Sequence, residues 1–176
     1  MSELLAHDHA KLNESYYDLC VAFEKGEIPQ THDRLDRFWA GLAVHIRAEH
    51  LVLFPAILSA LRVGNQSGAP SLAQAESMVE QLRHDHDFFM RQLAEAIRLM
   101  RGFLDTSASE SEGEGIETVQ EIIAAVVQRL ATHNKIEEEG IYLWVGSTLN
   151  ELQRSELTAR VQHELSRMPP RFEAPR

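Results

Sequence analysis

The sequence predicts an all-α protein, an up-down-up-down antiparallel four-helix bundle with an additional C-terminal helix. Two observations lead to this prediction. Apolar residues recur at steps of three and four along several long segments, which is the spacing of one helix face. Short or medium-length polar stretches join these segments, as in antiparallel bundles. The expected helices cover residues 3–25, 32–62, 71–104, 116–145 and 147–168.

Glycine, proline and capping residues delimit the first two helices. The stretch GEIPQ, from residue 26, ends the first helix. Thr31 is expected to cap the second helix, with Asp33 in the first turn, where a negative charge is favourable. Pro55 is expected to kink this helix or to end its regular part. The sequence GNQSGAP that follows is typical of a loop.

Two further boundaries divide the second half of the chain. The acidic, Gly- and Ser-rich stretch DTSASESEGEG, from residue 105, is interpreted as a solvated, mobile loop. Ser147 is expected to cap the C-terminal helix. We therefore expect one domain, with the bundle at residues 1–146, the C-terminal helix packed on it at 147–168 and a loose tail at 169–176.

Length, charge and cysteine content limit the class of function. A chain of 176 residues that is 44% hydrophobic is one globular domain with a sizeable core. The net charge of −10 argues against binding to nucleic acid or to anionic membranes. No apolar run reaches the length expected of a membrane span, and the N-terminal residues do not resemble a secretion signal. The lone cysteine, Cys20, fits a reducing cytoplasm.

Ionisable side chains interrupt the apolar faces of all four bundle helices. His45 and Glu49 are four residues apart, so they project from one helix face, and the same HxxxE spacing recurs further along the chain. About one HxxxE match is expected by chance, so the motif alone is weak evidence. The number of inward ionisable residues and their placement on all four helices matter more. Burying such groups without partners is costly, and pairing them with one another adds little stability. We therefore predict a metal site formed by the inward residues His9, His45, Glu49, His86, His133 and Glu137.

The ligand set favours two metal ions over one. Four imidazoles and two carboxylates exceed the four ligands of a structural zinc site, and no thiolate cluster is present for an iron–sulfur centre. Two glutamates from opposite helices can each bridge a metal pair about 3.5–4 Å apart. Mixed nitrogen and oxygen ligation with open positions suits iron, and manganese or zinc less well. Ferritin-type sites use Glu-x-x-His, a spacing that does not occur in this sequence.

The order of His9, HIRAEHLVLFP from residue 45, RHDHDFF from residue 83 and HNKIEEEGIYL from residue 133 resembles the hemerythrin HHE cation-binding family. The resemblance covers residues 3–145. It implies an oxo- or hydroxo-bridged di-iron centre held by the six inward residues, with the two glutamates bridging. Members of the family bind O2 for transport, storage or sensing, and others serve iron homeostasis or the repair of nitrosatively damaged iron centres.

Two positions differ from the oxygen carriers of that family. Those proteins place HxxxH on the third helix, where this chain has Met90, and they end the set with an aspartate five residues after its histidine, where this chain has Glu137 at four. These differences favour sensing, storage or iron homeostasis over simple O2 carriage. His7, His50 and His84 are candidates to complete the coordination. Glu138 and Glu139 are interpreted as a solvated run.

We therefore expect a protein that binds O2 or a related small oxidant, rather than an enzyme. A di-iron oxidase or peroxidase with the same ligands is the main alternative, but the sequence shows no nucleotide-binding motif and no further redox group. Repair proteins of the family carry a cysteine-containing N-terminal segment, which is not seen here. A bundle without metal, in which the histidines pair with one another, is the third possibility. Exposure of Trp39 or Trp144 would indicate a homodimer.

Overall fold

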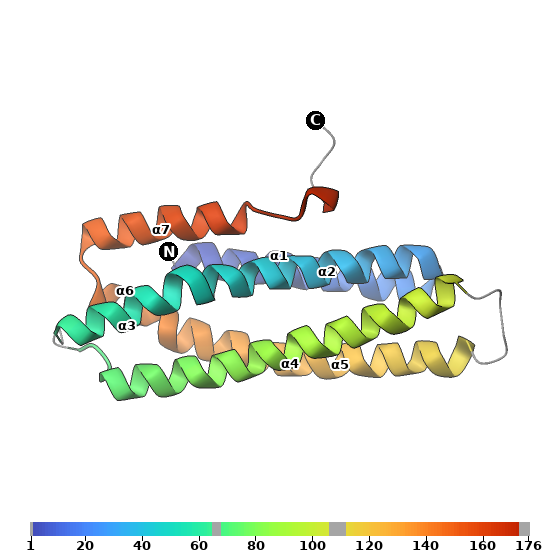
Figure 1. Ribbon diagram of the computed structural model, residues 1–176, viewed down its shortest axis with the longest axis horizontal. Coiled ribbons are helices and arrows are strands. Elements are labelled where there is room, and N and C mark those ends of the chain that lie inside the picture. The colour runs from blue at the N-terminus through green and yellow to red at the C-terminus, as the bar shows by residue number, and fades with distance from the viewer. Residues whose placement is uncertain (1, 65–67, 106–111, 173–176) are drawn as a thin grey trace.

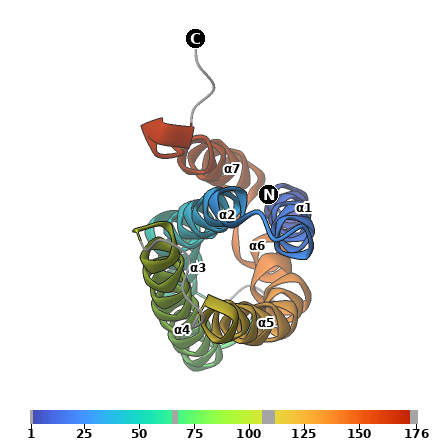
Figure 2. The same cartoon turned by 90° about the vertical axis from the view of Figure 1, so that its right-hand side faces the viewer.

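The computed structural model describes residues 2–64, 68–105 and 112–172, and these residues form helices and no strand (Figure 1). This confirms the all-α prediction. The long helices are α1 (Ser2–Glu24), α2 (Ile28–Ala48), α4 (Leu72–Asp105) and α5 (Glu112–Ile136). Seen end-on, these four helices surround a common centre, and α7 (Glu151–Leu165) lies outside them beside α2 (Figure 2).

Two helices begin at other residues than expected. Helix α2 begins at Ile28 with Pro29 in its first turn, a position that suits proline because its missing N–H would have no partner there. Thr31 is therefore not the N-cap, and its hydroxyl donates to the Glu27 carbonyl at 3.0 Å. Helix α7 is capped by Asn150, which forms a reciprocal capping box with Gln153, instead of by Ser147.

A π-helical segment interrupts the regular helix at each of the two HxxxE motifs. Helix α2 continues through Glu49–Leu53 into α3 (Phe54–Val63), and α5 continues through Glu137–Ile141 into α6 (Tyr142–Thr148). The expected irregularity at Pro55 is therefore a π segment that ends at Leu53, two residues before this proline. Proline alone does not explain it, because the corresponding residue after the second segment is Leu143.

The π segments shift the buried face of the helix that follows by one residue. Regular α-helical periodicity, continued from Glu49 and Glu137, would place Ala56 and Trp144 on the inward face, but both are only partly buried. Ile57 and Val145 are buried in their place, at no more than 2% exposure. A π turn holds about one residue more than an α turn, so the apolar face moves by one position.

The apolar core consists of two clusters with the ionisable residues between them. One cluster includes Leu5 and Leu82, and the other includes Leu12 and Phe89. His9 lies in sequence between the two members from α1, and His86 between the two from α4. The six predicted ligands therefore form a polar layer across an otherwise apolar bundle.

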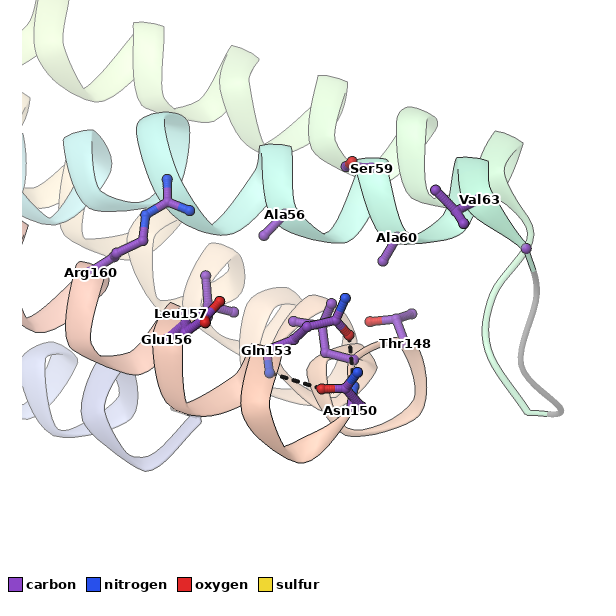
Figure 3. A pocket seen from close by; sticks show the side chains of 12 residues that line it. Ala56, Ser59, Ala60, Val63, Thr148, Asn150, Gln153, Glu156, Leu157 and Arg160 are labelled. Atoms are coloured by element: carbon purple, nitrogen blue, oxygen red, sulfur yellow. Dashed lines mark hydrogen bonds between the residues drawn. The ribbon is translucent and has the colours of Figure 1, made fainter.

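Helix α7 packs along α2 through apolar and ionic contacts. Leu157 and Val161 are buried in the first core cluster, and Arg47 Nε lies 3.0 Å from Glu164 Oε2. A surface pocket of about 450 Å³ separates α7 from α3 near Ala56, Ala60 and Arg160 (Figure 3). It contains none of the predicted ligands.

The expected loose segments fall partly outside the described residues. In the tail, Pro170–Phe172 form a short 3-10 helix whose Arg171 binds Asp36 at 2.8 Å, and residues 173–176 are not described. Residues 106–111 of the expected mobile loop are not described either, and α5 begins at Glu112 instead of residue 116. The domain boundaries stay predictions.

The helical run Ile28–Val63 is long and apolar enough, by length and composition alone, to cross a membrane. Its most apolar 18-residue window has a mean hydropathy of 1.4 and is 56% buried inside the protein. This corrects the expectation that no stretch reaches that length. The burial is that of a core helix, which passes the same test.

Two leucines of α7 test whether this helix belongs to the same cooperative unit as the bundle. Leu157 is 3% exposed and Leu152 is 68% exposed. We expect Leu157→Ala to lower the free energy of unfolding by about 2–5 kcal/mol, because it leaves a cavity in the core. Leu152→Ala should change it by no more than about 0.5 kcal/mol. Urea denaturation followed by circular dichroism measures both, and equal effects would mean that α7 unfolds independently.

Candidate metal centre

Four imidazoles and two carboxylates meet in the polar layer of the bundle. Each of the four long helices contributes one histidine, and each π segment begins with one glutamate. All six side chains are buried, with exposures of 3% or less. The structure thus brings together every residue of the predicted set: His9, His45, Glu49, His86, His133 and Glu137.

The six residues form two adjacent groups that share Glu137. In one group, His9 Nε2 lies 3.1 Å from His45 Nε2 and 3.2 Å from Glu137 Oε2. In the other, His86 Nε2 lies 2.9 Å from His133 Nε2, which is 3.0 Å from Glu137 Oε1. Within each group the potential ligand atoms lie within 4.8 Å of one another. We refer to these groups as the His9/His45 subsite and the His86/His133 subsite.

Glu49 belongs to the second group, with His86, His133 and Glu137, and also reaches toward the first. Its Oε1 lies 3.5 Å from His45 Nε2, and its Oε2 lies 3.3 Å from His86 Nε2. Glu49 and Glu137 therefore each turn one oxygen toward each subsite, as bridging carboxylates do in binuclear sites.

Hydrogen bonds on the outer side of the imidazoles fix the ring orientations. His45 Nδ1 lies 2.9 Å from Asp8 Oδ2, and His133 Nδ1 lies 3.1 Å from Asp85 Oδ2. A carboxylate can only accept, so these nitrogens carry the proton and donate it. The two HDH motifs thus place an aspartate beside the HxxxE histidine of a neighbouring helix.

The other two histidines have outer partners that differ from each other. His9 Nδ1 donates to Glu138 Oε1 at 2.8 Å, whereas His86 Nδ1 lies 2.8 Å from His50 Nε2. Glu138 directly follows Glu137, and His50 directly follows Glu49. Glu138 is therefore not simply part of a solvated run, and its side chain is 45% exposed.

If the imidazoles of His9 and His45 are neutral, their inner nitrogens face each other as unprotonated lone pairs. With Nδ1 protonated, a neutral imidazole can only accept at Nε2. His9 and His45 would present two such acceptors 3.1 Å apart, among carboxylate oxygens. Within the described residues, Glu49 Oε2 and Glu137 Oε1 are buried and receive no hydrogen bond. With neutral imidazoles this cluster lacks positive charge, which a bound cation would supply. The residues therefore fit a metal centre.

Neighbouring charges and burial shift the pKa values of several groups in the cluster. Burial lowers the pKa of His45, but Glu49 and Asp8 outweigh it and raise this pKa to about 10. Burial and the neighbouring Glu137 raise the pKa of Glu49. Burial and His133 lower the pKa of His86 to about 2. Burial lowers the pKa of His133 as well, but Glu137 and Glu49 outweigh it and raise this pKa. One imidazole of each subsite is therefore held in its charged form by neighbouring carboxylates.

Tyr142 is part of the site, although regular helix periodicity did not predict it. Residues five apart on an α-helix differ by about 140° in direction. In the π segment, the backbone N–H of Tyr142 bonds to the Glu137 carbonyl, which stacks the two residues on one face. Tyr142 donates its hydroxyl proton to Glu49 Oε1 at 2.6 Å and lies 3.2 Å from His9 Nε2. Burial and the two glutamates raise its pKa well above 10.

The remaining candidates lie outside the inner set. His50 contacts His86 and is half-buried, while His7 and His84 are exposed. Met90, at the position where oxygen carriers have a histidine, packs against the second apolar cluster. Sequence reasoning missed the roles of Asp8, Asp85, Glu138 and Tyr142. The repeated HDH was a signal for the two aspartates, since it occurs once in each half of the chain.

The shifted pKa of His45 predicts a pH dependence of the stability of the metal-free protein. The folded-state pKa of about 10 lies above the ordinary 6.5, so the stabilising proton is fully present below pH 6.5 and lost as pH rises through about 10. We expect the His45 contribution to fall by up to about 1.4 kcal/mol per pH unit in this range. Asp8→Asn should reduce the fall, because it removes a carboxylate that stabilises the charged imidazole.

Urea unfolding at a series of pH values, in the presence of a chelator, measures this effect. Asp18→Asn is the control, because Asp18 lies on the same helix but is 57% exposed and pairs only loosely with Arg34, at 3.7 Å. A pH profile of Asp8→Asn identical to that of Asp18→Asn would contradict the assignment.

Comparison with known proteins agrees with this geometry. The family model Hemerythrin HHE cation binding domain matches residues 1–145, a span that includes all six inward residues. No curated protein and no solved structure gives a significant match. The matched span covers more than half of the chain and confirms the resemblance found in the sequence. The chain therefore belongs to the hemerythrin HHE cation-binding family.

Proposed function

We propose that this chain binds two metal ions, with iron as the physiological metal, and that O2 or a related small oxidant binds there in sensing, storage or iron homeostasis. The observation behind this proposal is the pair of shared, buried carboxylates, each with one oxygen toward each pair of imidazoles. We also propose the up-down-up-down connectivity for the bundle, with α7 as an additional helix of the same domain.

The proposed roles of the residues follow from their contacts. His9 and His45 would hold one ion and His86 and His133 the other, while Glu49 and Glu137 bridge them. Bound iron supplies the electrons for reversible binding of an oxidant. The chain supplies fixed ring orientations through the outer hydrogen bonds, and the two apolar clusters on either side of the site exclude water.

A cavity beside His9 is consistent with access of a small ligand to the site. It has a volume of about 290 Å³ and lies between α1 and α5, lined by Tyr16, Phe38 and Asn134 among others, with His9 and Glu138 on its wall. Of the ligand set, only His9 lines this cavity. A diatomic molecule or a peroxide can therefore approach the His9/His45 subsite without unfolding the bundle.

An oxidase or peroxidase with the same ligands is the second candidate, and Tyr142 is the observation that favours it. Its hydroxyl lies 3.2 Å from His9 Nε2 and 3.4 Å from His45 Nε2. A buried hydroxyl at that place can donate a proton to a reduced oxidant, which general acid catalysis requires. A homodimer and a cytoplasmic location remain predictions.

Metal analysis tests the binding proposal. Protein purified from iron-supplied cells should contain about two irons per chain, as expected of a binuclear site. Glu49→Ala and Glu137→Ala should each lower the iron content strongly, because each removes a ligand shared by both ions. His84→Ala is the matched control, because His84 is exposed. Equal iron content in all three variants would show that the inward cluster is not the site, and wild-type protein without metal would favour a bundle whose histidines pair with one another.

Oxygen cycling separates the two candidate functions. A visible absorption change that reverses when O2 is removed, without consumption of O2, is expected for a binding protein. Sustained turnover of O2 or hydrogen peroxide would instead identify an enzyme. In that case Tyr142→Phe should lower turnover while leaving the iron content unchanged, since the variant removes only the hydroxyl.

A further inference from the structure

The two halves of the site correspond residue by residue, but their outer surroundings differ in charge. Each half contributes an HDH motif, an HxxxE motif, the residue after that glutamate, and an aromatic residue five positions after it. The corresponding pairs are Asp8 and Asp85, His9 and His86, His45 and His133, Glu49 and Glu137, His50 and Glu138, and Phe54 and Tyr142. Differences between the subsites can therefore be traced to single positions.

The His9/His45 subsite is surrounded by two carboxylates. Asp8 accepts from His45 Nδ1 and Glu138 accepts from His9 Nδ1, at 2.9 and 2.8 Å. Asp8 has no basic partner among the described residues other than His45. Both imidazoles of this subsite are therefore polarised by a negative charge, which raises their basicity toward a metal ion.

The His86/His133 subsite has no net negative charge in the corresponding places. Asp85 accepts from His133 Nδ1, but the same carboxylate also binds the Arg129 guanidinium, with Nε at 2.7 Å from Oδ1. The partner of His86 is the imidazole of His50, which carries no negative charge in any ordinary protonation state. The two subsites thus differ by about two unit charges in their outer partners.

We propose that the His9/His45 subsite binds its metal ion first and more tightly, and that Glu138 and His50 set this order. The inference rests on the proposed two-metal function. Each bridging carboxylate turns one oxygen to each subsite, so both subsites share these two charges and the outer partners carry the difference in charge. The Tyr142 hydroxyl hydrogen-bonds to the oxygen of Glu49 on the His9/His45 side, a contact that Glu138→Gln and His50→Glu leave in place. Outer partners of metal-bound histidines typically change affinity by about 10–100-fold.

Anaerobic titration of the metal-free full chain with Zn(II), in competition with a chromogenic chelator, tests the difference in affinity. We expect two binding steps whose dissociation constants differ by at least about tenfold. Titration with Co(II), followed by the paramagnetically shifted imidazole N–H resonances, identifies the subsite. At one equivalent, the shifted resonances should come from His9 and His45, not from His86 and His133.

Two variants test the positions that set the order. Glu138→Gln keeps an acceptor for His9 but removes its charge, so it should weaken the tight step by about tenfold or more. His50→Glu places a carboxylate beside His86. It should therefore lower the dissociation constant of the weaker binding step and reduce the difference between the two constants. Glu139→Gln is the control, because it removes the same charge at the next residue. The Glu139 side chain is 69% exposed, and its one ion pair among the described residues is with Lys135. Thermal melts establish that the variants are folded.

The outcomes are distinct from those that test the proposed function. Two zinc ions bound with equal affinity, or Co(II) appearing first at His86 and His133, would overturn the inference while the two-metal function stands. Equal effects of Glu138→Gln and Glu139→Gln would also overturn it. A chain that binds no ion at all would overturn the proposed function and the inference together.

Discussion

The whole arrangement depends on two glutamates that are fully buried among the inner nitrogens of four imidazoles. Glu49 and Glu137 have no exposed surface, and one oxygen of each receives no hydrogen bond within the described part of the chain. The free-energy cost of removing carboxylates from water is far larger than the stabilisation from the hydrophobic contacts around them. Such a layer is stable only if positive charge enters it, as protons on His45 or as metal ions. The choice between proton and metal therefore determines both the stability and the function of this bundle.

The outer hydrogen bonds explain why the aspartates of the HDH motifs stand next to a ligand without binding its ring. Neighbouring residues on a helix point about 100° apart, so Asp8 cannot follow His9 into the centre. It lies at the α1–α2 contact and orients His45 of the next helix. Asp85 does the same for His133 between α4 and α5. Each helix pair is therefore joined by an aspartate–histidine bond that fixes the tautomer, and the four helices are held in register by the site itself.

Regular periodicity was sufficient to find the six inward residues, because the motifs lie on helices that are α-helical up to each glutamate. It failed just beyond them. The π segments rotate the chain, so Tyr142 enters the site and Ile57 and Val145 replace Ala56 and Trp144 in the core. The partners of the outer hydrogen bonds lie on the edges of their helices and become recognisable only when the neighbouring helix is placed. Glu138 is half exposed, as a solvated residue would be, and its role depends on His9, which is 129 residues away in sequence.

The cavity, the tyrosine hydroxyl and the unneutralised carboxylates all lie at the same subsite. The cavity reaches His9, the Tyr142 hydroxyl lies beside His9 and His45, and the two unneutralised carboxylates accept from these rings. Aromatic rings enclose the other subsite instead. Phe54 stacks on His86 with centroids 6.1 Å apart, and Phe89 packs edge-on against His133 at 5.2 Å. Tyr142 and Phe54 are corresponding residues, and they differ only by the hydroxyl oxygen of Tyr142. Under the proposed function, a small oxidant that enters through the cavity would meet a polar subsite with a proton donor. The aromatic side would keep water from the second ion.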